Sequence, residues 1–222
     1  AHFESHWQSA SNNTANYSYR KINQEGNKST TANTAISTAI ADEDWDYISF
    51  QQGSSISGLF STYVTPLPLL FKYVKERSTN PRVKYIFHQT WAYAKNSTHS
   101  AFVNYDKDQD VMYRAISNST AQVKNLVDID LIVPAGTAIQ NGRSSVIGDN
   151  FCRDGYNLDL NIGRYTASCV WFESLFGKSV VGNTFKPAAL SPYETEIAQK
   201  AAHLAVLKPL EITPMVDYRD RD

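Results

Sequence analysis

The segment with the clearest chemical potential is RDGYNL, at positions 153–158. Asp154 supplies a carboxylate, which can hold a neighbouring base in the right orientation and stabilise its protonated form. Asn157 follows three residues later, and an amide cannot take a proton from a hydroxyl group at neutral pH. The segment therefore offers an acid that could orient a neighbouring group, beside an amide that cannot itself act as a general base.

A second candidate is Gln52, in the polar stretch 51–55 that follows the apolar run 46–50. Its side-chain amide lies next to Gly53 and could donate a hydrogen bond to the oxyanion of a tetrahedral intermediate. Alternatively, Gln51 and Gln52 simply satisfy backbone groups of their own loop. The sequence leaves both interpretations open.

A third group of candidates follows the apolar run 83–87 and consists of His88, Gln89, Trp91 and Tyr93. Aromatic rings can stack on the face of a sugar while polar groups orient its hydroxyls, so these residues predict a carbohydrate-binding cleft. The alternative is a buried tryptophan and a hydrogen-bonded core histidine. Arg153 could likewise clamp a substrate carboxylate or pair with an acidic neighbour.

The elements that must position these residues follow from hydrophobic periodicity. Apolar residues predict strands at 46–50, 83–87 and 130–133, and each run is followed by a polar loop, the third at 136–141. Helical spacing predicts helices near 67–77, 108–126, 163–176 and 192–206. Residues 1–40 are rich in Ser, Thr, Asn and Ala and predict a loop-rich surface segment with one or two short helices, and 208–222 predicts a tail.

Strands that alternate with helices predict an α/β fold with a mainly parallel, doubly wound sheet, covered by helices on both faces as a three-layer α/β/α sandwich. Ligands of such sheets bind beyond the carboxyl ends of the strands. The length of 222 residues is consistent with one domain over 1–222. We therefore expect the three polar loops to meet at one edge of the sheet.

Composition narrows the class of partner. The formal net charge is −1, from 21 basic and 22 acidic residues, so no strong positive field is expected for nucleic acid. No apolar run is long enough to predict a membrane span. The two cysteines, Cys152 and Cys169, lack metal-ligand spacing, so we expect no metal or other cofactor; two free buried thiols are favoured over a disulfide between them.

Several segments together resemble the SGNH (GDSL-type) hydrolases. Residues 153–158 resemble the D-x-x-H-L block of that superfamily, and 132–141 is similar to the segment before it. Residues 44–54, 88–93 and 163–165 are similar to an uncharacterised branch common in secreted proteins of gut bacteria. The resemblance covers about residues 4–207 and implies a flavodoxin-like SGNH fold and a secreted or periplasmic location.

The resemblance implies an esterase acting on acylated or methyl-esterified carbohydrate. Asp154 would be the acid of the triad, Asn157 stands where the family carries its histidine, and His6 would lie at the pocket rim. A first strand ending in Gly-Asp-Ser or Gly-Asn-Ser has no counterpart before Glu4, so we expect the nucleophile and a strand completing the sheet upstream of Ala1. A non-catalytic protein that binds a glycan or a protein partner is the alternative.

Overall fold

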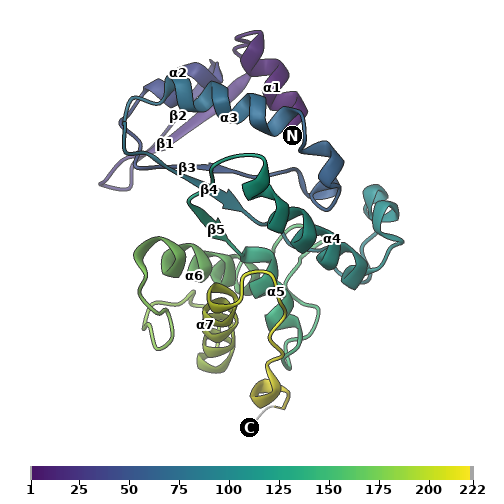
Figure 1. Ribbon diagram of the computed structural model, residues 1–222. Helices are drawn as coiled ribbons and strands as arrows, with labels where there is room; N and C mark the ends of the chain where they lie inside the picture. The colour runs from purple at the N-terminus through teal and green to yellow at the C-terminus, as the bar shows by residue number, and fades with distance from the viewer. Residues whose placement is uncertain (1, 221–222) are drawn as a thin grey trace.

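The computed structural model describes residues 2–220 and shows an α/β fold (Figure 1). Its central sheet has three parallel strands in the order β3-β4-β5, which are Tyr47–Phe50, Lys84–His88 and Leu131–Val133. The predicted strands are thus confirmed, as is their parallel pairing. The order is sequential, so the described part of this sheet contains no point at which the strand order reverses.

Alternate residues of β4 face two different cores because side chains along a strand point to opposite faces. Tyr85 and Phe87 pack in a cluster with residues of α1 and α3, whereas Ile86 packs with residues of α5, α6 and α7. The run 83–87 is apolar on both faces for this reason. Helices accordingly lie on both sides of the sheet in Figure 1.

The four helices predicted from periodicity correspond closely to α3, α4, α6 and α7. The bounds of the helices are α1 Phe3–Ser11, α2 Ile36–Ala41, α3 Pro66–Arg77, α4 Gln109–Gln122, α5 Ala135–Arg143, α6 Ile162–Phe176 and α7 Pro192–Leu207. Local chemistry sets several ends. Ser191 and Glu194 form a reciprocal capping box at the start of α7, and Gly177 ends α6 with a φ of 62°, a conformation that glycine adopts freely.

The prediction for residues 1–40 was incomplete. This segment holds α1, α2 and an antiparallel hairpin of β1 (Tyr17–Ile22) and β2 (Lys28–Thr34), joined by a turn in which Gly26 has a φ of 82°. Six of the seven residues of β2 are exposed. A strand that is polar on both faces shows no alternation of apolar and polar residues, so periodicity could not reveal it.

The prediction of a polar loop at 136–141 was wrong, because these residues lie inside helix α5. Helix α5 begins directly after β5 and is buried along most of its length, with small residues facing its neighbours. Gly136 shows why: a Cβ atom there would lie 1.9 Å from the carbonyl oxygen of Thr90. The backbone of the helix therefore packs directly against the backbone of the loop after β4. Small residues permit this close approach, but they do not by themselves predict a helix.

The 208–220 segment folds back onto the helices. Met215 is buried, and its backbone N–H donates to Ser144 Oγ at 2.8 Å.

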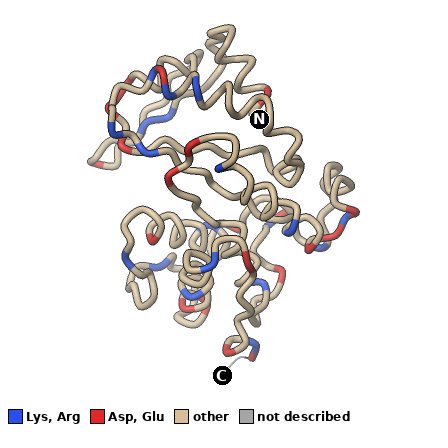
Figure 2. The backbone as a smooth tube through the Cα atoms, viewed as in Figure 1, with Lys and Arg blue, Asp and Glu red and all other residues tan. Residues whose placement is uncertain are grey.

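Basic and acidic residues are interspersed along the chain in Figure 2. Among the described residues, no helix combines the length and apolar character needed to cross a bilayer.

Candidate functional site

The carboxyl ends of β3 and β4 meet through a contact between side chains. His88, the last residue of β4, lies with its Nδ1 2.5 Å from Gln51 Oε1. His88 is buried beside Trp91 and Trp171, with ring centroids 6.4 and 5.3 Å away. Burial lowers the pKa of His88 to about 4, so its imidazole is neutral at physiological pH.

The loop after β4 is held by Gln89, which is fully buried. Its Oε1 accepts hydrogen bonds from the backbone N–H and the hydroxyl of Thr137, at 2.9 and 3.1 Å. Gln89 Nε2 is buried and has no hydrogen-bond partner among the described residues. The side chain thus fixes the first turn of α5 against the end of β4.

The predicted acid and its neighbour form a compact unit. Asp154 Oδ1 accepts hydrogen bonds from the backbone N–H groups of Tyr156 and Asn157, at 3.1 and 2.7 Å, and Oδ2 accepts one from Asn157 Nδ2 at 2.8 Å. These bonds to Asn157 are the main reason why the pKa of Asp154 is lowered. An ionised carboxylate therefore orients the side chain at position 157.

The 152–158 segment is fastened to the loop after β4. Trp91 Nε1 donates to the carbonyl oxygen of Tyr156 at 2.7 Å, and the Ala94 N–H donates to the carbonyl oxygen of Gly155 at 2.8 Å. Gly155 has a φ of 88°, and a Cβ atom there would lie 2.9 Å from Ser97. The structure therefore brings Asp154 and Asn157 next to the predicted cleft residues.

Tyr93, one of the predicted cleft residues, lies in an aromatic cluster with His99 and Tyr156, which were not predicted as site residues. The fully buried ring of Tyr93 contacts Tyr156 and His99, with centroids 6.0 and 4.9 Å away, and its hydroxyl lies 3.2 Å from Ser54 Oγ. His99 and Tyr156 also contact each other. The loop after β3, the loop after β4 and the 152–158 segment are thereby joined.

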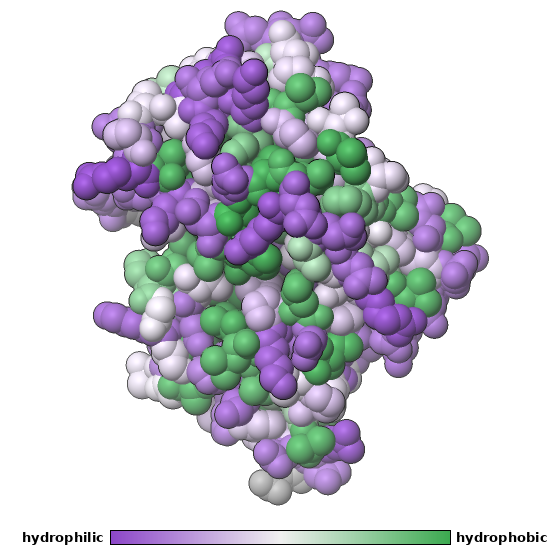
Figure 3. All heavy atoms as spheres, viewed as in Figure 1, coloured by the Kyte–Doolittle hydropathy of each residue, from purple (hydrophilic) through white to green (hydrophobic). Residues whose placement is uncertain are grey.

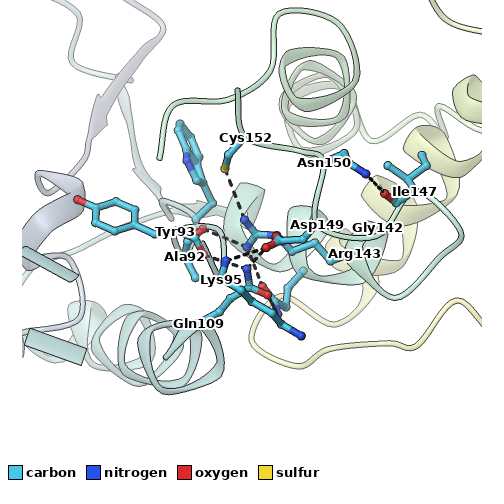
Figure 4. Close-up of polar contacts among 12 residues, drawn as sticks. Ala92, Tyr93, Lys95, Gln109, Gly142, Arg143, Ile147, Asp149, Asn150 and Cys152 are labelled. Carbon is cyan, nitrogen blue, oxygen red and sulfur yellow. Dashed lines mark hydrogen bonds and ion pairs between the residues drawn. The ribbon is translucent and has the colours of Figure 1, made fainter. Parts of the chain in front are cut away.

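Arg143, at the end of α5, was also not predicted as a site residue (Figure 4). Its side chain is only 4% exposed and lies with Nε 2.8 Å from Asp149 Oδ1. One terminal nitrogen donates to the carbonyl oxygen of Ala92 at 3.0 Å, and the other contacts Cys152 Sγ at 3.5 Å. Burial raises the pKa of the Cys152 thiol to about 11, so this thiol is protonated.

Two predicted residues have other partners. The amide of Gln52 is buried, with Oε1 accepting from the N–H groups of Phe3 and Gly53 and Nε2 donating to Thr62. Its contacts match the alternative in which it satisfies backbone groups. His6 pairs with Tyr17 OH at 2.8 Å and stacks on that ring, in the N-terminal segment rather than at the strand ends.

Arg153 lies at the site and is 44% exposed, with Nε 3.9 Å from Asp154 Oδ2. This spacing is that of a weak surface pair, which leaves the guanidinium accessible to solvent. Cys152 and Cys169 both carry free thiols. Within residues 2–220, no three His, Cys, Asp or Glu side chains converge to hold a metal ion.

These features define an α/β protein with polar and aromatic side chains clustered at the carboxyl ends of two parallel strands. A family profile described as a domain of unknown function, DUF4886, matches residues 1–205. The chain belongs to the DUF4886 family. The crystal structure of a DUF4886 family protein from Bacteroides uniformis ATCC 8492 is similar at a TM-score of 0.95 and 45% identity, over 99% of this chain and 84% of that one. Among curated proteins, none matches this chain.

Proposed function

We propose that this chain carries the acid and the binding loops of an SGNH-type ester hydrolase that acts on acylated or methyl-esterified carbohydrate. The proposal includes the finer architecture, a doubly wound α/β/α sandwich. It is supported by the parallel sheet, by helices on both of its sides and by polar loops at the carboxyl ends of β3 and β4. We propose a secreted or periplasmic location on the same resemblance.

The observation that carries the proposal is the hydrogen bond from Asn157 Nδ2 to Asp154 Oδ2, at 2.8 Å. In an SGNH hydrolase an aspartate orients a histidine through such a bond, and the histidine takes a proton from the serine nucleophile. In the proposed site Asp154 would supply this carboxylate, and the amide of Asn157 would take the position of the imidazole. Asparagine has no basic nitrogen, so position 157 decides between binding and turnover.

The surroundings suit a carbohydrate ester. Trp91 and Tyr156 are half-buried, so parts of their rings remain available for stacking on a sugar. Arg153 is exposed and can meet a carboxylate. Gln89 and Tyr93 are fully buried, so they would act on a ligand through the loops that they hold.

The test uses the natural full-length protein and its Asn157→His variant, with hydrolysis of 4-nitrophenyl acetate as the assay. General-base catalysis contributes about 10²–10⁴-fold, so the variant should exceed the parent by at least about a hundredfold. The Asp154→Asn, Asn157→His double variant should lose most of that gain, because the imidazole is no longer oriented. A folded Asn157→His variant that is no faster than the parent would exclude this mechanism.

A second candidate is a non-catalytic descendant that binds a glycan or a protein partner. Asn157 itself favours it, because a missing general base impairs turnover without disturbing the aromatic and polar loops. An active serine hydrolase should be labelled by a fluorophosphonate probe. A binding protein should escape labelling and still be retarded in a glycan affinity gel, and the Trp91→Ala variant should lose this retardation.

A further inference from the structure

A cavity of about 360 Å³ lies along helix α6, in contact with the segment 178–190. Ligand pockets in proteins span roughly 300–1,000 Å³, so this volume suits a small organic molecule. None of the residues proposed above for the carbohydrate site lines it. Its lining includes Leu160, Arg164, Tyr165, Cys169, Phe172 and Phe185.

Hydrogen bonds fix the segment that forms the outer wall of this cavity. Tyr165 OH donates to the carbonyl oxygen of Phe185 at 2.6 Å, and Gln199 Nε2 donates to the carbonyl oxygen of Asn183 at 2.8 Å. The Val180 N–H donates to the buried carboxylate of Glu173 at 3.0 Å. The wall is therefore tied to α6 and α7, and the cavity is preformed.

The wall is apolar and open to solvent. Leu160 is 52% exposed, Phe172 36% and Phe185 74%, although a folded chain gains by covering large apolar side chains. Figures 1 and 3 show the molecule from the same side. Figure 3 shows apolar surface in the region where Figure 1 shows α6. Clustered exposed apolar side chains around a concave site commonly mark a binding surface.

One positive charge stands in this apolar setting. Arg164 lies in the first turn of α6, lines the cavity and is exposed. Among the described residues, no carboxylate forms an ion pair with it. A guanidinium with free donors prefers a carboxylate, which it can bind through two parallel hydrogen bonds. The ligand that complements this cavity therefore has an apolar body and one anionic end.

We propose that this cavity binds a carboxylic acid with a medium-length acyl chain, with the chain against the wall of Leu160, Phe172 and Phe185 and the carboxylate on Arg164. The proposal does not depend on the esterase assignment. It stands on the cavity, the fixed apolar wall and the unpaired guanidinium.

The first experiment is calorimetric titration of the full-length protein with butanoate, hexanoate and octanoate. Affinity should rise about fourfold for each added methylene, since each buried methylene contributes a constant increment. Octan-1-ol, which lacks the negative charge, should bind at the same site about tenfold more weakly than octanoate does. Arg164→Gln should weaken octanoate about tenfold, whereas the matched variant Arg114→Gln, at an exposed arginine of α4, should bind as the parent does.

Two variants probe the cavity itself. Ser168→Phe places a ring into it from an exposed position of α6 and should abolish octanoate binding. Leu160→Ser removes part of the wall without added bulk and should weaken binding, which keeps the test readable if Ser168→Phe folds poorly. Octanoate that does not bind at millimolar concentration, or that binds all these variants equally, would overturn the proposal.

The two cysteines provide an internal control. Cys169 lines the cavity and Cys152 does not, and burial raises the pKa of each thiol to about 11. Octanoate should slow alkylation of Cys169 by N-ethylmaleimide, measured by peptide mass spectrometry, and leave Cys152 unaffected. Equal rates with and without octanoate at Cys169 would place the ligand elsewhere.

Discussion

Replacing Arg143 by methionine tests whether the loops of the candidate site are held by a single buried cation. The aliphatic stem is kept, so the packing around it changes little. The guanidinium is lost, together with its contacts to the Ala92 carbonyl oxygen, Gln140, Asp149 and Cys152. The carboxylate of Asp149 then remains 28% exposed without its partner.

Breaking a buried ion pair by removing one partner costs about 3–5 kcal/mol of unfolding free energy. The lower end applies here because Asp149 keeps hydrogen bonds from the Lys95 N–H and from Gln109 Nε2. A loss of about 3 kcal/mol in a chain of this size corresponds to a fall in Tm of roughly 6–12 °C. Lysine at 143 should fall between the parent and methionine, since it keeps the charge without the fork of donors.

Urea denaturation measures this loss as a lower midpoint at an unchanged slope. The matched control is Arg153→Met, since Arg153 is 44% exposed and pairs with Asp154 only at 3.9 Å. Its unfolding free energy should stay within about 0.5 kcal/mol of the parent. An Arg143→Met protein as stable as Arg153→Met would refute the view that Arg143 holds the loops.

Two further changes probe the strand ends. Because burial lowers the pKa of His88 to about 4, below the ordinary value near 6.5, the unfolded chain binds the proton first. Stability from this group is complete above pH 6.5 and is lost as the pH falls towards 4, so His88→Gln should reduce the acid-induced fall in unfolding free energy by roughly 3 kcal/mol. Gly136→Ala should destabilise the protein by about 3 kcal/mol or more in the same urea assay, because the new methyl group would lie 1.9 Å from the Thr90 carbonyl oxygen. The control is Gly177→Asn, in open space at a φ of 62°, whose unfolding free energy should stay close to that of the parent.

The parts of the fold that could be predicted are those with local signals. The run 83–87 is apolar at successive positions because β4 is covered on both faces, and α7 carries both its apolar stripe and its capping residues in the sequence. The strand β2 and the helix α5 lack such signals. Helix α5 depends on a close backbone approach between Gly136 and Thr90, which are 46 positions apart and share no sequence pattern.

The same distinction applies to the site. Asp154 and Asn157 are three residues apart, so their spacing alone predicts the contact that the structure contains. Arg143 was missed because it contacts Ala92, 51 residues earlier in the chain, and no local pattern distinguishes it from a surface arginine at the end of a helix. The RDGYNL segment supplies the polar groups of the site, while their place beside Trp91 depends on Arg143 and on the rings of Tyr93 and His99, which come from other segments. A variant that keeps Asp154 and Asn157 but loses Arg143 should therefore retain the local turn and lose its position in the site.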